Sequence, residues 1–146
     1  LVQFIFIHRI QRASKVYPCL GGNCTTPASG ALQITKVRWD PPGDERGKPN
    51  SETIRVSNTG VTPLSLFGYE LRAGGFGYEF GVYDTLAAGA SLTLRLGGGR
   101  STADVRHLGL RRAALANGGD RILLRSFDGA HLDCKAWGRV RCPAGY

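Results

Sequence analysis

Three histidines and a few serines are the side chains of this sequence that nucleophilic or acid–base chemistry would use. His107 and His131 each have an aspartate within three residues, Asp104 and Asp133. A Ser-His-Asp enzyme also needs a strained turn that presents the nucleophile and backbone N–H groups that hold the oxyanion. The sequence contains no Gly-x-Ser-x-Gly turn. We therefore interpret the His–Asp neighbours as surface hydrogen bonds and predict a protein that is not an enzyme.

Four cysteines form one pair near each end of the chain: Cys19 with Cys24, and Cys134 with Cys142. Four cysteines allow three pairings, and nearest-neighbour pairing closes the shortest loops. An even number in a small basic domain is typical of an oxidised, extracellular protein. The alternative is a four-cysteine zinc site, whose pairs enclose about two to four residues. The first pair encloses four residues and the second seven, so we expect disulfides and no metal or cofactor.

Two further groups of residues have ligand-binding chemistry. Asp40, Asp44 and Glu52 are hard oxygen donors that suit calcium, but the loop lacks an aspartate-rich repeat and contains basic residues. We expect Asp40 and Glu52 to cap turns and pair with arginine. Residues 97–99 are three glycines whose N–H groups are able to cradle a phosphate. They lack the Gly-Lys-Ser/Thr ending of a phosphate-binding loop, so we expect a plain hairpin loop.

The charge of the chain favours acidic partners. Lys and Arg number 19 against 11 Asp and Glu, which gives a net charge of +8. This balance favours contact with acidic glycans, teichoic-type wall polymers or nucleic acid. The cations are scattered, which does not favour specific nucleic-acid binding. The candidate polyanion contacts are Arg106, Arg111, Arg112, Arg139 and Arg141.

The pattern of the chain predicts the elements that position these residues. The 146 residues suffice for one domain, and 21 Gly and 7 Pro favour short strands over a helical bundle. From residue 31 onward, about eight alternating segments are separated by turns at roughly ten-residue intervals. Leu92, Leu94 and Leu96 are the clearest half-buried strand. The pattern predicts an antiparallel β-sandwich over 31–146, with 108–116 as a helical turn or irregular loop.

Residues 1–30 differ from the rest and are interpreted as an N-terminal arm. An apolar strand, a small Cys loop and a linker of small residues follow one another. A strand that is apolar on both faces needs cover on both. It either completes its own sheet or adds to the open edge of a neighbouring molecule. The candidate assembly residues are Val2, Phe4, Ile5, Phe6, Ile7 and Ile10.

The aromatic residues allow a second kind of contact, with glycans. Phe76, Tyr78 and Phe80 share one face at period-two spacing and are expected in the core. Trp39 and Trp137 lie near the ends of predicted strands, and we expect them to be the better candidates for an exposed contact.

The order of motifs resembles the lamin-tail domain, the immunoglobulin-like sandwich of nuclear lamins that also occurs in secreted bacterial proteins. The resemblance covers about residues 31–142. Tyr69 stands where the family usually has Trp, and 109–116 lacks the usual aromatic residues. The motifs are Ile34 to Val37, Trp39 to Gly43, Ser51 to Val56, Asn58 to Gly60, Leu66 to Leu71, Tyr78 to Phe80, Leu86 to Gly89, Leu92 to Gly97, Asn117 to Asp120 and Leu123 to Gly129.

The ending, from Asp133 to Gly138 with Cys142, looks like the secreted actinobacterial branch of the family, in which Cys134 and Cys142 would form a disulfide. The resemblance implies an all-β, immunoglobulin-like antiparallel sandwich. Residues 1–30 have no counterpart in the family domain, and we expect them to form an extended N-terminal arm. It also implies a structural or interaction module outside the cell and no catalysis.

The expected function is self-assembly at a bacterial cell surface through residues 1–10, with other copies of the chain as partners. The alternative is a module that binds an acidic polymer or cell-wall glycan. No apolar run approaches the roughly 18 residues of a membrane span. The chain lacks Met even at its first position, so we expect a processed or truncated product.

Overall fold

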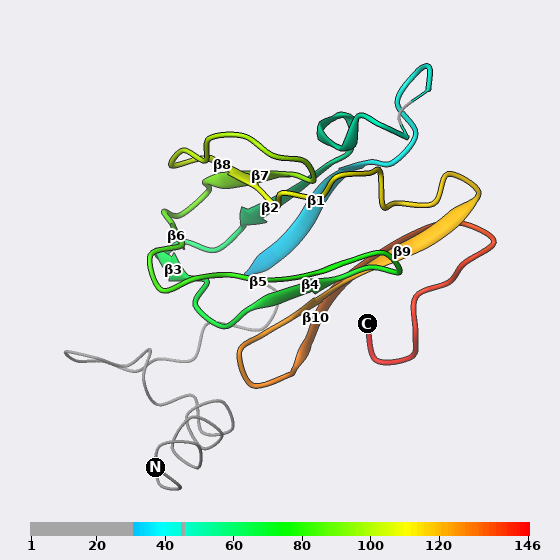
Figure 1. Ribbon diagram of the computed structural model, residues 1–146. Coiled ribbons are helices and arrows are strands. Elements are labelled where there is room, and N and C mark those ends of the chain that lie inside the picture. The colour runs from blue at the N-terminus through cyan, green and yellow to red at the C-terminus, as the bar shows by residue number, and fades with distance from the viewer. Residues whose placement is uncertain (1–30, 45) are drawn as a thin grey trace, which may run out of the picture.

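A β-sandwich of two four-stranded sheets forms the body of the protein (Figure 1). The structure is a computed structural model, and it describes residues 31–44 and 46–146. The predicted arm, with Cys19, Cys24 and the candidate assembly residues, lies outside the described residues. In Figure 1 the two sheets form two layers, with β1, β2, β7 and β8 in the upper layer.

The prediction of an all-β, immunoglobulin-like antiparallel sandwich is confirmed. The first sheet has the order β1-β2-β7-β8, the second has the order β10-β9-β4-β5, and β3 pairs with β6 in a separate ribbon. Residues 108–116 form an irregular loop. The strands are β1 (Leu32–Arg38), β2 (Thr53–Asn58), β3 (Leu64–Ser65), β4 (Glu70–Arg72), β5 (Gly77–Glu79), β6 (Thr85–Leu86), β7 (Ser91–Arg95), β8 (Val105–His107), β9 (Gly119–Arg125) and β10 (His131–Gly138), and the 3₁₀ helix η2 (Pro49–Ser51) precedes β2.

Alternating side chains of the strands build the core between the sheets. Successive residues of a strand point to opposite faces, so the apolar positions of β2 and β7 all point to the second sheet. Ile54, Leu94 and Leu96 have no exposed surface. The full set of buried apolar residues is Leu32, Ile34, Ile54, Val56, Leu64, Leu66, Tyr69, Leu71, Phe80, Leu86, Leu92, Leu94, Leu96, Leu115, Ile122, Leu124 and Trp137.

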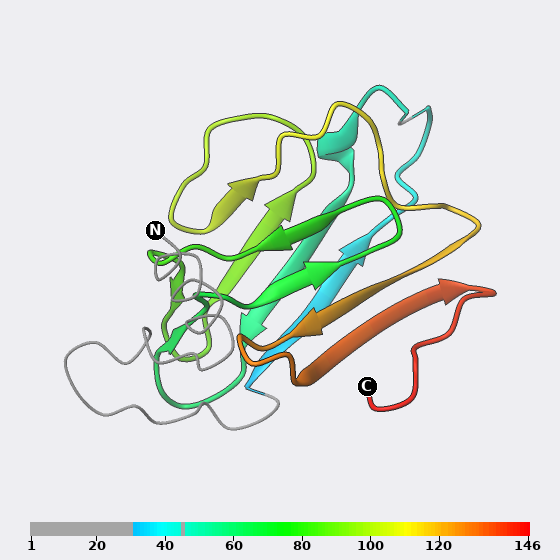
Figure 2. The same ribbon diagram turned by 60° about the horizontal axis from the view of Figure 1, so that its bottom comes forward.

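One strand pair departs from the antiparallel pattern, because β8 runs parallel to β7. Parallel neighbours cannot be joined by a tight hairpin, so the expected hairpin at 97–99 is wrong. After β7 the chain instead runs back in a long loop toward the start of β7, and β8 then begins beside it (Figure 2). Gly99 has a φ of +151°, and a Cβ there would lie 2.6 Å from Nε2 of His107. The close approach of loop and strand therefore requires glycine at this position.

A buried asparagine fixes the loops at one end of the sandwich. Asn58 is the last residue of β2 and is 1% exposed. Its Nδ2 donates to the carbonyl oxygens of Thr62 (2.8 Å) and Leu86 (3.1 Å), and its Oδ1 accepts from the N–H of Gly60 (3.0 Å). The turn after β2 is therefore tied to the chain around the β3–β6 ribbon. Buried polar groups of this kind are costly unless they are hydrogen-bonded.

A buried carboxylate has the same role at the opposite end of β2. Glu52 immediately precedes the strand and has no exposed surface. Its two oxygens accept the N–H groups of Ala114 (2.7 Å) and Leu115 (3.0 Å). These bonds hold the 108–116 loop against the sandwich and direct Leu115 into the core. The expectation that Glu52 pairs with arginine missed these backbone partners, which lie more than 60 residues away in sequence.

Replacement of this carboxylate tests its contribution to stability. Glu52→Ala leaves two backbone N–H groups without their acceptors, and we expect the free energy of unfolding to fall by about 3 kcal/mol. Asp40→Ala is the matched control, because Asp40 is exposed; its change should stay within about 0.5 kcal/mol. Urea unfolding followed by tryptophan fluorescence measures both, and similar values for the two variants would contradict this role of Glu52.

Candidate functional site

The two outermost strands on one side of the sandwich close against each other. β1 ends the first sheet and β10 ends the second. The N–H of Ile34 on β1 donates to Oδ2 of Asp133 on β10, at 2.8 Å. This bond links the two sheet edges through a side chain, so neither strand offers its outer edge along this contact to a further strand.

Two tryptophans complete the closure at one end of these strands. The rings of Trp39 and Trp137 stack with centroids 4.8 Å apart. Trp137 is 8% exposed, and its Nε1 donates to the carbonyl oxygen of Ala116 at 2.7 Å. The expectation of an exposed Trp137 that contacts glycans is therefore wrong. Its indole has an internal partner, and Trp39 covers it.

On the other side of the sandwich, the edge of β8 is capped by its own preceding loop. The N–H of Thr102 donates to the carbonyl oxygen of Val105 at 2.8 Å. The N–H of His107 donates to Oγ of Ser101 at 3.0 Å. Two of the backbone groups of β8 that point away from β7, the carbonyl of Val105 and the N–H of His107, thus have partners within the same segment.

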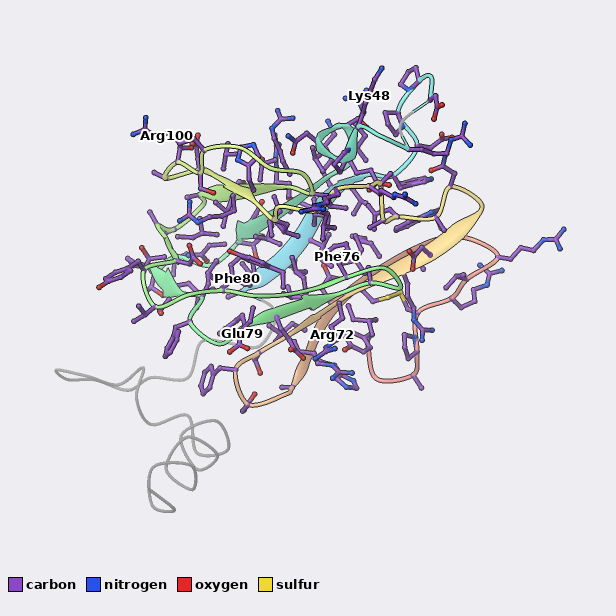
Figure 3. The ribbon with its side chains drawn as sticks, in the orientation of Figure 1. Lys48, Arg72, Phe76, Glu79, Phe80 and Arg100 are labelled. Carbon is purple, nitrogen blue, oxygen red and sulfur yellow. A yellow bond between two sulfur atoms is a disulfide. The ribbon has the colours of Figure 1, made fainter. Side chains whose placement is uncertain are left out.

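β5 is the remaining edge strand of the two large sheets. The N–H of Phe80 donates to the carbonyl oxygen of Tyr69, and the carbonyl oxygen of Phe76 accepts from the N–H of Ala73. The backbone N–H and C=O groups of the even-numbered residues of this segment therefore point to β4. The backbone groups of 77 and 79 point to the outer side, where no described strand pairs with β5. Figure 3 shows Phe76 and Phe80 directed between the sheets, whereas Glu79 points away from the core.

Exposed apolar side chains follow directly after this edge strand. Val82 is 56% exposed and Tyr83 is 92% exposed. Among the large apolar side chains that the structure describes, the third with such exposure is Val61, in the loop after β2, at 93%. An edge strand beside exposed apolar side chains has the chemistry that accepts another strand.

The arginines that were expected to contact a polyanion lie on three separate segments of the structure. Arg106 lies on β8 and forms an ion pair with Asp84, with 2.6 Å between Nη2 and Oδ1. The side chain of Asp84 is 7% exposed and that of Arg106 is 21% exposed, so this pair lies largely inside the fold. Arg111 and Arg112 are exposed in the loop after β8, and Arg139 and Arg141 are exposed after β10.

A cationic face that sequence reasoning missed lies on the outside of the first sheet. Directly paired residues of neighbouring strands point to the same side of a sheet. Lys36 is paired with Arg55, and Arg38 with Thr53, which is in turn paired with Arg95. All four basic residues are exposed. We call Lys36, Arg38, Arg55 and Arg95 the cationic face.

No acidic residue occupies an outward position on the four strands of the first sheet. The ion pairs between described residues do not include any of the four members of the cationic face. The remaining outward residues are polar or small apart from Val105 and His107. They are Gln33, Thr35, Thr53, Ser57, Ser91 and Thr93.

The outside of the second sheet has a different character. Arg72 and Arg125 both lie near Glu70, at 3.3 Å and 3.8 Å between nitrogen and oxygen. The C-terminal residue, Tyr146, stacks on His131 with ring centroids 4.1 Å apart and accepts a hydrogen bond from Arg125. Opposite charges and the C-terminal segment therefore neutralise and partly cover this face.

The chemistry of the described residues gives no support to a metal site. Cys134 and Cys142 are joined in a disulfide, which confirms that pairing and removes both as thiolate ligands. Hydrogen bonds from Arg46 hold the pKa of Asp44 below its usual value, and Glu52 binds backbone N–H groups. Within 31–44 and 46–146, no three His, Cys, Asp or Glu residues are grouped as a metal ion would require. The same part of the chain contains no helix long and apolar enough to cross a membrane.

The protein is therefore an immunoglobulin-like β-sandwich whose candidate binding surfaces are the edge of β5 and the cationic face. A family model described as Lamin Tail Domain matches residues 25–139. The chain belongs to the lamin tail domain family, a family of non-catalytic immunoglobulin-like domains with structural and interaction roles. A comparison with curated proteins found no match.

The disulfide makes a measurable contribution that can be isolated. Cys142→Ser opens the loop between 134 and 142, and we expect it to lower the free energy of unfolding by about 2.5 kcal/mol, because short loops give the smaller stabilisation. Both proteins should carry Cys19→Ser and Cys24→Ser so that the first cysteine pair does not contribute. Equal urea midpoints with and without Cys142→Ser would contradict the expectation.

Proposed function

We propose that this protein is a secreted, non-enzymatic structural module that assembles with copies of itself at a cell surface. In this proposal, residues 1–10 of one copy add as a strand to the edge of β5 in the next copy. Residues 11–30 form the connection, and twenty residues span at most about 70 Å, which suffices to reach a neighbouring domain of this size.

The edges of the two large sheets support strand addition at β5. β1 and β10 are joined through Ile34 and Asp133. β8 is partly capped by residues 101 and 102. β5 is the edge strand that remains, and the exposed side chains of Val82 and Tyr83 lie directly after it. The apolar residues of the arm, among them Phe4 and Phe6, match such a surface.

The disulfide supports a location outside the cell. Disulfides persist in oxidising compartments and are rare in the cytosol, and Cys134–Cys142 is formed. The secreted actinobacterial branch of the family is part of this proposal, as is the absence of catalysis.

The oligomeric state of the intact chain tests the proposal. We expect large or filamentous assemblies by light scattering and negative-stain microscopy, and monomers for a chain that lacks residues 1–15. Val82→Lys with Tyr83→Lys should also give monomers, because two charges beside β5 disfavour an apolar strand there.

Val61→Lys is the control for adding a cation at an exposed apolar position, because Val61 is 93% exposed and lies in the loop after β2 instead of the segment that follows β5. This variant should assemble like the intact chain. Monomers for the intact chain, unchanged by the deletion, would overturn the proposal and indicate that the arm packs on its own domain.

A further inference from the structure

We propose that the cationic face, made of Lys36, Arg38, Arg55 and Arg95, is a binding site for a polyol-phosphate polymer, in which hydroxyl-bearing units are linked by phosphodiesters. This site is distinct from the β5 edge and does not use the arginines in the loops. The face belongs to the first sheet, and β5 belongs to the second.

The charges of the face are available to a ligand. All four side chains are exposed, and none of them forms an ion pair with another described residue. Of these side chains, that of Arg95 donates a hydrogen bond from Nη1 to the carbonyl oxygen of Asn50, at 3.2 Å. Since a carbonyl carries no net charge, Arg95 keeps its full positive charge. At the rim, Lys48 and Arg100 also point away from the second sheet (Figure 3).

The positions of the cations suit a linear polymer with several negative charges better than a single small anion. Lys36 and Arg55 face each other across neighbouring strands, roughly 5 Å apart at their backbones, and Lys36 and Arg38 are two residues apart, roughly 7 Å. Arg95 lies on the third strand, two strands away from Arg38. The positive charges therefore cover three strands, and a linear polymer is able to contact several of them at once.

The remaining outward side chains favour phosphate-linked polyols over nucleic acid. Single-stranded nucleic acids are held by bases that stack on aromatic side chains, and these outward positions hold no Phe, Tyr or Trp. Hydroxyl groups lie beside the cations instead. Oγ1 of Thr35 lies 2.7 Å from Oγ of Ser57, which in turn lies 2.7 Å from Oγ of Ser91. Ser57 is only 8% exposed, so Thr35 and Ser91 carry the more accessible hydroxyls. One guanidinium group can form two parallel hydrogen bonds to the oxygens of one phosphate. The hydroxyl groups of the protein are able to hydrogen-bond the polyol units.

Binding of a glycerol-phosphate polymer to the full-length protein tests the assignment. We expect affinity to fall steeply between about 50 and 500 mM NaCl, because each phosphate contact releases a counterion. Arg55→Glu with Arg95→Glu should weaken binding by roughly 25-fold at low salt, about fivefold for each cation lost. Arg55→Gln with Arg95→Gln removes the two charges without reversing them and should also lose affinity. This milder pair keeps the test available if the reversed charges disturb folding.

Arg111→Glu with Arg112→Glu is the matched control, since it changes the net charge equally at exposed loop positions. It should weaken binding far less than the pair in the face. Three results would each overturn the proposal: no binding of the polymer, equal losses for the two charge-reversed variants, or equal affinity for duplex DNA or for a carboxylated glycan such as hyaluronate. The urea midpoint of every variant verifies that the comparison is made on folded protein.

Discussion

The hydrogen bonding of buried polar groups at the two ends of β2 is the constraint on which this sandwich depends. Glu52 and Asn58 bracket the central apolar residues of the strand, and both are buried. Each binds backbone groups of loops that are distant in sequence. An unsatisfied group at either place would cost free energy comparable to a large part of the stability of a small domain. β2 therefore fixes the loops at both ends of the fold as well as the core between them.

The fixed loops explain how the surfaces of the molecule differ. One side of the sandwich is closed by Asp133 and the stacked tryptophans. On the other side β8 is partly capped by its preceding loop, while no described strand pairs with the outer edge of β5. The outside of the second sheet pairs its own charges and meets Tyr146. The outside of the first sheet collects cations without acidic partners. This member of a family of structural and interaction domains thus has two separate surfaces, an apolar edge and a charged face.

Local patterns predicted much of the fold. The alternation of Leu92, Leu94 and Leu96 and the turn residues gave strands in nearly the right places, and the spacing of the last two cysteines matched their disulfide. The parallel placement of β8 was missed, because the glycines of 97–99 allow a hairpin as readily as a longer return. Trp137 was placed at the surface because its position near a strand end carries no information about Trp39. The cationic face was missed although Lys36 and Arg38 alternate along one strand, since its other members lie on strands whose pairing is set by the fold.

By itself the sequence determined that the chain forms short strands with one apolar face, that it carries excess positive charge and that it suits an oxidising environment. These properties follow from residue type and from the two-residue period of a strand, which are local. The tertiary structure decided which cations share a face, which edge stays open and which carboxylate is buried. Such choices depend on strand register and on contacts across sixty or more residues, and these are set by the packing of the whole core.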